Sequence, residues 1–480
     1  MGPFKAYDIR GIYKTDLDED LAYRIGRALP ALLGGRRALI GRDARLSSPS
    51  LAAELARGLA DAGCAVDDMG LASTPMVYFF TASKHYDFSI QVTASHNPPE
   101  YNGFKISRAE ARPVGYDSGL ADLEAAVARP LPAAVSTAAQ PSTSEGIRGQ
   151  AIGNSDAAQP PTHNLSPLPA ALTRGTITKV DYRSEFTDFL RKWVPDLSGL
   201  KLVVDCSDGM ASLVVRDLFG DAPTYVAAKP DGNFPNHAPN PFEPAGRTLI
   251  VDTVKKLKAD VGVIYDGDAD RMMLIDENGD FVRPDLMIAV MAMRFLRDFP
   301  GATILHDIRT SRGVTEYLQK AGATTAMWKV GHAFAKQKLR ELNAVFGGEL
   351  AGHYYFRDFF WCDSGELASL VALSEIAAAH KKGIKLSQLV TDISTYANTG
   401  ELNFKIENKA EVMERLKDHF TAQEKPVALY DFDGYRVEYA DWWFNVRLSN
   451  TEPYLRLILE ARTPALLNEK LAEIKALIGQ

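Results

Sequence analysis

The sequence predicts an α/β protein with three repeated α/β domains, followed by a smaller α+β domain with an antiparallel sheet, all around a central cleft. Two observations support this class. An apolar strand, a polar loop and a helix recur in that order three times, and the pattern changes beyond about residue 395. Because ligands of open α/β sheets collect beyond the carboxyl ends of the strands, each repeat should present one loop to the shared cleft.

The three repeats share one layout, in which a strand ends in an acidic residue and a helix follows after a short loop. The strand and helix of each repeat are 38–43 with 50–62, 202–205 with 210–219, and 303–307 with 313–320. In the first repeat, Ser48 and Pro49 are typical of a helix start, and Gly63 is typical of a helix end.

A later strand of each repeat runs into a loop of unusual residues. The strands are 89–92, 261–264 and 344–346, and the loops are those of Ser95, of Asp266 and of residues 347–353. Ordinary βαβ connections without a shared site are the alternative. Since the three loops carry complementary chemistries, we favour one common site.

Beyond about residue 395 the pattern indicates an antiparallel sheet with helices. The predicted elements are helices over 411–420 and 464–477 and strands over 434–439, 442–448 and 454–460. We place the four domains at residues 1–177, 178–280, 281–392 and 393–480. Residues from about 130 to 173 are rich in Pro, Ala, Ser, Thr and Gln and cannot bury enough apolar surface to fold, so we expect a flexible insertion there.

The composition is that of an ordinary globular protein, with 46% apolar and 24% charged residues in a chain of 480. The net charge of −7 argues against a nucleic-acid surface but not against a phosphorylated small molecule. No apolar run reaches the roughly 18 residues needed to span a membrane. Cys64, Cys206 and Cys362 are widely spaced and odd in number, so neither disulfides nor a zinc site is indicated, and a cytoplasmic location fits.

The loop from Thr93 to Lys105 presents the hydroxyl of Ser95 on a tight turn that contains prolines. A serine hydroxyl needs help to act as a nucleophile, and the absence of a Gly-x-Ser-x-Gly elbow argues against acyl transfer. His96, Asn97 and Lys105 instead supply donors for a bound phosphate. The alternative is that Ser95 is only a turn residue.

Three aspartates, Asp266, Asp268 and Asp270, alternate in the second loop. Magnesium prefers carboxylate and phosphate oxygens, and alternation in an extended segment would point all three side chains to one side. A phosphate on Ser95 would supply a fourth oxygen. Arg271 and the missing distal glutamate argue against an EF-hand, and the alternative is a solvated acidic turn. A hydroxyl that carries phosphate and a magnesium site together indicate phosphoryl transfer.

With these motifs in this order, the chain resembles the α-D-phosphohexomutase superfamily, in its phosphomannomutase/phosphoglucomutase branch, over nearly all of its length except the insertion. The resemblance implies mixed-sheet αβα sandwiches and an isomerase that interconverts hexose 6-phosphate and hexose 1-phosphate, with mannose, glucose or both as the sugar. It also implies a phosphoserine at Ser95, a hexose 1,6-bisphosphate intermediate, and one Mg²⁺ per chain held by Ser95, Asp266, Asp268 and Asp270.

Two later loops extend the resemblance. Residues 348–353 resemble the family's sugar-specificity loop, and residues 447–453 resemble its phosphate-binding loop. The substrate-binding candidates are Tyr7, Arg309, Lys329, His332, Glu349, Ala351, Arg447, Ser449, Asn450 and Thr451. The catalytic candidates are Arg10, Ser95, His96, Lys105, Arg271 and His353.

The chemistry of these side chains agrees with such roles. Glu349 can accept from two neighbouring sugar hydroxyls, and Arg447 has a planar fork suited to phosphate. Ala351 stands where relatives often have serine, so selectivity between sugars stays open. Arg309 stands where many relatives have lysine, and either side chain keeps the charge, although their geometries differ. The alternatives are an exposed loop acid for Glu349 and a strand arginine that extends to solvent for Arg447.

We expect phosphoserine 95 to give its phosphoryl group to a sugar hydroxyl while the magnesium site and nearby arginines offset the charge. Lys105 and His353 are the candidate bases, with Lys105 preferred because it closes the Ser95 loop. The bisphosphate must then turn end over end, so a hinge near residues 390–400 should let the last domain open and close.

Three other functions fit part of the pattern. They are a phosphoglucosamine mutase, a metal-dependent sugar phosphatase and a sugar-phosphate sensor without catalysis. A phosphatase does not need two opposed sugar-holding loops, and a sensor would need a broken serine or aspartate loop. We expect small sugar phosphates as ligands, no nucleic-acid or membrane partner, and a monomer or homodimer.

Overall fold

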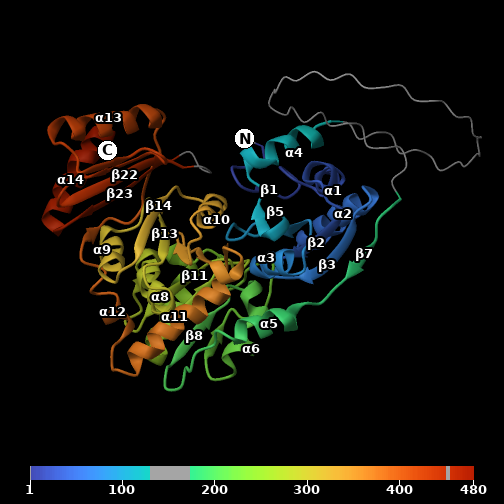
Figure 1. Cartoon of the computed structure of the whole chain (residues 1–480), viewed down its shortest axis with the longest axis horizontal. Coiled ribbons are helices and arrows are strands. Elements are labelled where there is room, and N and C mark those ends of the chain that lie inside the picture. Colours follow the sequence, from blue (N-terminus) through green and yellow to red (C-terminus); the bar gives the residue numbers. More distant parts are fainter. Residues whose placement is uncertain (1, 130–172, 450–453, 480) are drawn as a thin grey trace, which may run out of the picture.

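The computed structural model describes residues 2–129, 173–449 and 454–479, which form four sheets in chain order (Figure 1). Three α/β units are followed by a C-terminal unit with an antiparallel sheet, which confirms the predicted fold class. The predicted flexible insertion lies, except for residue 173, outside the described residues. In the described part of the chain, no helix is both long and apolar enough to cross a membrane.

The first sheet is mixed and has the strand order β1-β5-β4-β2-β3-β7, with β6 beside β5. Its strands are β1 (Ile9–Ile12), β2 (Arg37–Arg42), β3 (Ala65–Leu71), β4 (Phe88–Val92), β5 (Tyr101–Arg108), β6 (Arg112–Pro113) and β7 (Ile177–Lys179). Its helices are α1 (Glu19–Leu33), α2 (Ser48–Asp61), α3 (Thr74–Ser83) and α4 (Leu120–Val127). Strand β4 is parallel to β2 and antiparallel to β5, so the Ser95 loop connects an antiparallel pair.

The second and third sheets have the orders β12-β11-β10-β8-β9 and β14-β13-β15-β16-β17. The second contains β8 (Leu202–Asp205), β9 (Thr224–Val226), β10 (Val261–Tyr265), β11 (Met272–Asp276) and β12 (Phe281–Val282). The third contains β13 (Thr303–Asp307), β14 (Thr324–Trp328), β15 (Phe346–Gly348), β16 (Tyr354–Phe356) and β17 (Cys362–Asp363). The antiparallel pairs β10–β11 and β15–β16 correspond to β4–β5, so all three candidate loops occupy the same place in their units.

Helices and 3₁₀ turns connect these strands. The α-helices are α5 (Arg183–Arg191), α6 (Val215–Phe219), α7 (Thr248–Leu257), α8 (Pro284–Asp298), α9 (Arg312–Lys320), α10 (His332–Glu341), α11 (Gly365–His380) and α12 (Leu386–Leu389). Ser73 and Ser364 cap the starts of α3 and α11 by accepting backbone N–H groups, which satisfies donors that the first turn leaves unpaired.

The C-terminal sheet has the order β18-β23-β22-β21-β20, with β19 beside β23, and its neighbours are antiparallel. Its strands are β18 (Ala397–Asn398), β19 (Leu402–Phe404), β20 (Ala428–Tyr430), β21 (Tyr435–Glu438), β22 (Trp442–Leu448) and β23 (Leu455–Ala461). The helices α13 (Lys409–Gln423) and α14 (Pro464–Ile478) pack against it.

Two of the predicted elements differ from the structure. The helix expected over 210–219 is a 3₁₀ turn, Met210–Leu213, followed by α6, because Val214 has a non-helical backbone and Ser212 bonds the carbonyl of Gly209. The strand expected from residue 344 begins only at Phe346. The N–H of Ala344 instead closes the end of α10 by donating to the carbonyl of Leu339.

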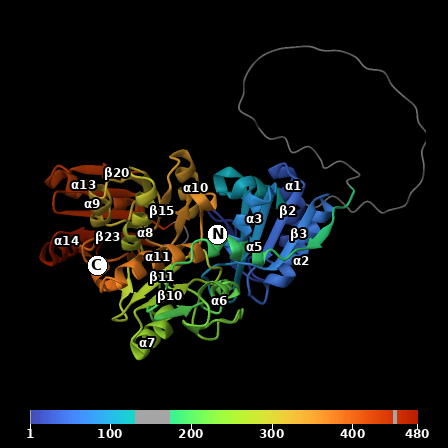
Figure 2. The same cartoon turned by 60° about the horizontal axis from the view of Figure 1, so that its bottom comes forward.

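The apolar cores show which units belong together. One core runs through the second and third units and includes α3 of the first, whereas the C-terminal unit has its own core around Trp442 and Leu457. A small apolar cluster of Leu350, Trp443 and Ile458 joins the third and fourth units. Figures 1 and 2 both place the C-terminal unit (red) at the opposite end from the first (blue). The fourth unit is therefore the one with the least apolar attachment.

Candidate active site

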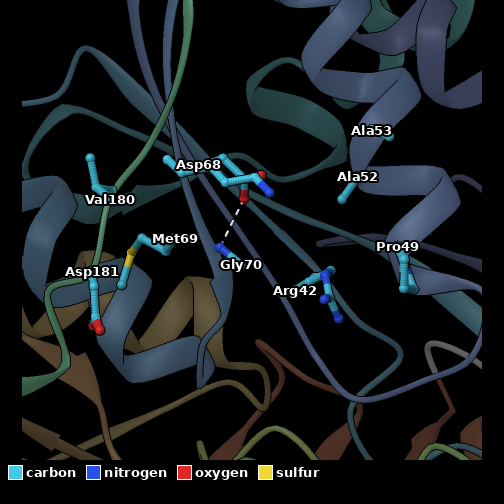
Figure 3. Close-up of a pocket in the computed structure, with 10 residues that line it drawn as sticks. Arg42, Pro49, Ala52, Ala53, Asp68, Met69, Gly70, Val180 and Asp181 are labelled. Atoms are coloured by element: carbon cyan, nitrogen blue, oxygen red, sulfur yellow. Dashed lines mark hydrogen bonds between the residues drawn. The ribbon is translucent and has the colours of Figure 1, made fainter.

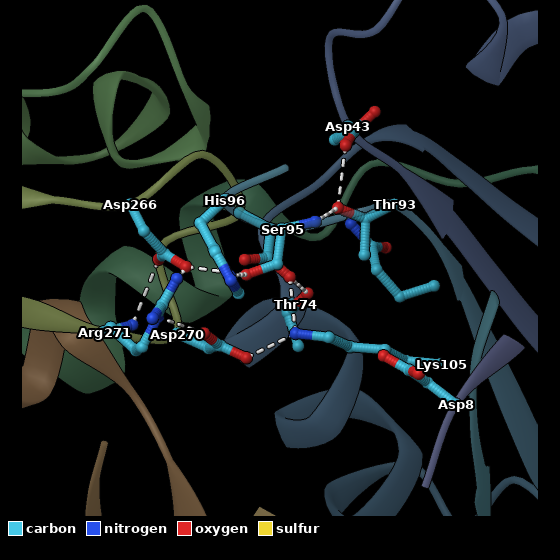
Figure 4. Close-up of polar contacts among 12 residues, drawn as sticks. Asp8, Asp43, Thr74, Thr93, Ser95, His96, Lys105, Asp266, Asp270 and Arg271 are labelled. Carbon is cyan, nitrogen blue, oxygen red and sulfur yellow. Dashed lines mark hydrogen bonds and ion pairs between the residues drawn. The ribbon is translucent and has the colours of Figure 1, made fainter. Parts of the chain in front are cut away.

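Ser95 lies three residues after the end of β4 and is 3% exposed. Its backbone lies in the left-handed region, with φ at +51°, and its N–H donates to Oγ1 of Thr93 over 2.9 Å. The hydroxyl of Thr93 in turn donates to Asp43 over 2.7 Å (Figure 4). A serine in this sparsely populated conformation is held there by its surroundings, which is common at functional loops.

Arg45 holds the backbone of this loop from behind. Its Nη2 donates to the carbonyls of Ser95 and Asn97 over 2.8 and 2.7 Å, and its Nη1 donates to the carbonyl of Tyr101 over 3.0 Å. The side chain is fully buried and pairs with Asp43 over 3.1 Å. One guanidinium thus fixes several carbonyls of the Ser95 loop, which a point charge such as lysine cannot do.

The three aspartates converge, but by a turn rather than by an extended segment, which corrects the expected geometry. The chain bends through Ala269, whose φ is +64°. Asp266, Asp268 and Asp270 are all 0% exposed, and each offers a carboxylate oxygen within 4.8 Å of the others. Among the described residues, Oδ1 of Asp268 and Oδ1 of Asp270 have no hydrogen-bond partner.

The Ser95 loop and the aspartate loop touch. Oγ of Ser95 donates to Oδ2 of Asp266 over 2.7 Å, although 171 positions separate the two residues (Figure 4). Burial and the neighbouring carboxylates raise the pKa of Asp266 to about 7, although Arg271 opposes this rise. An oxygen-only donor set with unsatisfied buried oxygens and excess negative charge fits a hard divalent cation.

Cations surround the aspartates. Nζ of Lys105 lies 2.7 Å from Oδ2 of Asp268 and also pairs with Asp270, and Nε of Arg271 lies 2.9 Å from Oδ2 of Asp266. Although burial lowers it, Asp268 and Asp270 raise the pKa of Lys105 well above its usual value. Lys105 is therefore an ammonium in this arrangement.

Two further candidates, His96 and Arg10, have contacts within the Ser95 loop. Nδ1 of His96 lies 3.2 Å from Oγ of Ser95, and burial together with Arg271 and Arg10 lowers the pKa of His96 well below its usual value. Arg10 donates to Oδ1 of Asn97 over 2.7 Å and pairs with Asp8. A neutral imidazole and a fixed guanidinium thus line the same loop.

The sugar-loop candidates meet behind the aspartates. Glu349 is 2% exposed, which contradicts the alternative of an exposed loop acid, and it accepts from the N–H of Gly331 over 2.7 Å and from the hydroxyl of Tyr355 over 2.5 Å. Nδ1 of His353 lies 2.7 Å from Oδ2 of Asp363, and a β-bridge joins His353 to Arg271. Although burial lowers it, Asp270 and Asp363 raise the pKa of His353.

The remaining sugar candidates lie around His332. Its ring packs edge-on against Tyr7 with 5.0 Å between centroids, and both of its ring nitrogens lack a hydrogen-bond partner within the described residues. Lys329 lies over the ring of Phe334 at 4.0 Å, and Ala351 is half-buried. His332, Tyr7 and Glu349 are therefore brought together, whereas the ammonium of Lys329 rests on an aromatic ring.

The phosphate-loop candidates are only partly described. Arg447 is 2% exposed, which contradicts an arginine that extends to solvent, and its Nη2 lies 3.1 Å from Oε2 of Glu401. Arg309 reaches the same carboxylate oxygen over 3.1 Å. Ser449 is half-buried, and Asn450 and Thr451 lie outside the described residues.

Models of the four domains of one family match nearly the whole chain. The domains of the phosphoglucomutase/phosphomannomutase family match residues 1–129 (α/β/α domain I), 184–279 (α/β/α domain II), 283–396 (α/β/α domain III) and 401–477 (C-terminal domain). The chain belongs to this family.

Individual relatives agree with that membership. A phosphomannomutase of Escherichia coli is 37% identical over 491 residues, which cover 99% of this chain and 98% of the relative. A phosphoglucomutase/phosphomannomutase family protein of Burkholderia thailandensis has a similar crystal structure, with a TM-score of 0.82, 29% identity and coverage of 99% and 96%. The N-acetylphosphoglucosamine mutase of Aspergillus fumigatus, solved with GlcNAc-6P and magnesium, shares the fold with a TM-score of 0.60 at 13% identity and coverage of 99% and 95%.

Sequence reasoning missed three residues that support the site of this family member. Oγ1 of Thr74 donates to Oδ2 of Asp268 over 2.6 Å, Asp363 contacts His353, and Glu401 contacts Arg447. Thr74 comes from a helix start and Glu401 from a turn, so neither lies in a recognisable motif. Only Asp363 had a local sequence signal, because it ends a strand directly before Ser364, which caps the start of α11.

A cavity of about 520 Å³ in the first unit has none of the candidate residues in its wall (Figure 3). Its lining includes two cations, Arg42 and Lys179, and two carboxylates, Asp68 and Asp181. Because these charges balance, the cavity shows no bias for a phosphorylated ligand. The candidate active site therefore lies at the Ser95 and aspartate loops.

Proposed function

We propose that the protein interconverts hexose 6-phosphate and hexose 1-phosphate, with mannose, glucose or both as the sugar, and stores the travelling phosphoryl group on Ser95. The observation that carries this proposal is the 2.7 Å contact between Oγ of Ser95 and Asp266 of the buried acidic trio, in a chain of the phosphoglucomutase/phosphomannomutase family. This makes the protein a phosphohexomutase, an isomerase that works by phosphoryl transfer.

We propose that Asp266, Asp268 and Asp270, with a phosphate oxygen on Ser95, hold one Mg²⁺. When bound, the ion would offset negative charge on the phosphoryl group. Arg271 and Arg10 would stabilise the same charge from two sides, since phosphoryl transfer depends mainly on positioning and electrostatics. The hydroxyl of Thr74 would orient Asp268.

The contacts of Lys105 change our preference for the base. An ammonium held between two carboxylates is a poor proton acceptor, so we propose that Lys105 serves as a cation near the phosphoryl group. His353 becomes the preferred group to take the proton of the sugar hydroxyl. Its Nδ1 is engaged with Asp363, which would orient the ring and present Nε2 to the sugar.

We further propose that Glu349, His332 and Tyr7 bind the sugar and that Arg309, Arg447 and the loop after β22 bind its distal phosphate. A hexose 1,6-bisphosphate formed at Ser95 must turn to return its other phosphate. The least attached unit, the C-terminal one, carries Arg447, which suits an anchor that loosens during the turn. The cytoplasmic location remains a proposal supported by three buried, unpaired cysteines.

The test is to incubate the protein and its Ser95→Ala variant with hexose 1,6-bisphosphate and then to measure intact mass. One added phosphate on the unaltered protein, its absence in the variant, and mutase turnover only in the former are expected. Because the variant removes one oxygen from a loop held by Arg45, it should fold normally. Equal turnover in Ser95→Ala would contradict the covalent step.

The identity of the preferred sugar is open, because Ala351 offers no hydroxyl at a position that can discriminate between substrates. Assays with mannose 1-phosphate, glucose 1-phosphate and glucosamine 1-phosphate side by side decide between the mutase activities. Release of inorganic phosphate faster than mutase turnover would favour a phosphatase instead.

A further inference from the structure

The carboxylate of Glu401, between β18 and β19, accepts hydrogen bonds from three arginine side chains. Its Oε2 lies 3.1 Å from Nη1 of Arg309 and 3.1 Å from Nη2 of Arg447, and its Oε1 lies 2.8 Å from Nη1 of Arg456. Its side chain is 6% exposed. Arg309 comes from the third unit and the other two arginines from strands of the fourth, so this carboxylate joins two units across their boundary.

The same series of bonds continues to the sugar loop. Oδ2 of Asp307 lies 2.8 Å from Nη2 of Arg309 and accepts the N–H of Leu350 over 2.8 Å. Asp307 and Arg309 are 2% and 4% exposed. An unbroken line of charge-assisted bonds therefore connects Leu350 to Arg447 through Glu401.

The side chain of Leu350 forms a second connection between the same parts. It packs with Trp443 and Ile458 of the fourth unit in a small apolar cluster. Two independent contacts, one polar and one apolar, thus tie the sugar loop to the sheet that carries Arg447.

The charges of the cluster explain why a carboxylate stands there. Burial and the neighbouring Arg309 lower the pKa of Arg447, which means that the two guanidiniums repel each other. Although burial raises it, Arg309, Arg447 and Arg456 hold the pKa of Glu401 at about 2, so the carboxylate is ionised and offsets that repulsion. Nε of Arg447 is buried and has no hydrogen-bond partner within the described ranges, which leaves a donor for a ligand.

We infer that Glu401 is a positioning residue that holds Arg309 and Arg447 together as one clamp for the distal phosphate of the substrate and couples this clamp to the sugar loop. The inference rests on the proposed function and names a residue that acts through others. Arginines that are already oriented lose less freedom when a phosphate binds, so a fixed clamp binds more tightly than two loose side chains.

The test compares the unaltered protein with Glu401→Gln and Glu401→Asp in steady-state and single-turnover assays. Glutamine keeps the size but loses the charge and turns an amide N–H toward a guanidinium, and aspartate keeps the charge but shortens the reach. We expect KM for hexose 1-phosphate to rise about ten- to a hundredfold in both variants, as for loss of one charge-assisted hydrogen bond. The single-turnover rate of transfer from loaded Ser95 should change by less than about threefold, because that centre is not touched.

The matched control is Glu460→Gln. Glu460 is 0% exposed in the same unit and also reaches the third unit, where the N–H of Arg312 donates to it over 2.9 Å, but it accepts from Trp443 rather than from Arg447. A purely structural effect would raise KM in this variant as well. We expect its stability to fall while KM stays within about twofold.

A double-mutant cycle checks that Glu401 acts through Arg447. In an Arg447→Lys background, Glu401→Gln should add little to the rise in KM, since the clamp is already open. Full additivity overturns the inference, and so does a lower KM in Glu401→Gln, which would mean that the carboxylate competes with phosphate for Arg447. A protein that lacks mutase turnover altogether contradicts the proposed function and not the clamp, whose affinity for inorganic phosphate can be compared in the same variants by calorimetry.

Discussion

The transfer centre around Ser95 and the arginine cluster around Glu401 are both buried and charged, but they are held in different ways. At Ser95, loops of the first and second units interlock through the buried contacts of Thr74 with Asp268 and of Ser95 with Asp266, and Arg45 fixes the Ser95 loop within the first unit. At Glu401, the bonds cross to a unit with a separate apolar core. In the proposed mechanism, the phosphoryl group would therefore move at a fixed place, while the far end of the sugar would be held by a unit with less apolar attachment.

The largest loss of activity should come from a change in the acidic trio of Asp266, Asp268 and Asp270, which belongs to the transfer centre. Asp266→Asn keeps the shape and an acceptor for Ser95 but removes one charge, and we expect turnover to fall on the order of 100-fold or more. Because burial and the neighbouring carboxylates raise the pKa of Asp266 to about 7, the folded protein favours its neutral form at lower pH, and the apo variant should not lose stability there. Steady-state assays with and without a chelator, and thermal unfolding, measure both.

Asp276→Asn is the control for this change. Asp276 ends β11 in the same unit and accepts the N–H groups of Asn278 and Asp280 in a turn. We expect activity within about threefold of the unaltered protein. A loss as large as that of Asp266→Asn would show that any carboxylate of this unit matters, and the trio would have no special role.

A smaller loss of activity should follow from Arg45→Lys, which tests how the Ser95 loop of the transfer centre is held in place. One ammonium cannot reach the carbonyls of Ser95, Asn97 and Tyr101 together, so the loop should lose its position. We expect kcat to fall about ten- to a hundredfold with little change in KM, because misplacement of the nucleophile affects the transfer step.

Arg57→Lys serves as the matched variant for Arg45→Lys. Arg57 lies on the surface of α2, where it pairs with Glu54, and it does not touch the loop. Its kcat should be unchanged. If Arg45→Lys raises KM and leaves kcat intact, then Arg45 shapes substrate binding and the comparison of the two halves is wrong.

The smallest effect concerns stability and not turnover. Burial raises the pKa of Glu366, which lies behind the aspartate loop, from 4.5 to about 8. The folded state therefore favours the neutral acid, so its contribution to stability is full below about pH 4.5 and is lost as the pH rises through about 8. Since glutamine is always neutral, Glu366→Gln should gain stability over the unaltered protein by a few kcal/mol between those two pH values.

Denaturant unfolding at a series of pH values from 4.5 to 8 measures this difference. A difference in the free energy of unfolding that grows with pH supports a buried neutral carboxyl group at Glu366. A constant gap would mean that the carboxyl group finds an ionic partner on ionisation.

Local patterns predicted much of the fold and of the transfer centre. The period of apolar residues and the start and stop residues of helices act over a few positions, so strands such as β22 and helices such as α9 were predicted within one or two residues. The helix expected over 210–219 was wrong where the hydroxyl of Ser212 bonds the nearby carbonyl of Gly209, because that competition has no periodic signature.

The sequence by itself determined which functional side chains the protein contains and the order of the three equivalent loops that carry them. The reason is that the hydroxyl, carboxylate and turn residues occur in short segments next to strand ends. Only the tertiary structure decided which groups meet. Asp266 reaches Ser95 across 171 positions, Lys105 is paired as an ammonium with Asp268, and Glu401 contacts arginines from two units. Such contacts depend on how sheets pack against each other, and the packing free energy is spread over a whole core, so no short pattern in the chain encodes them.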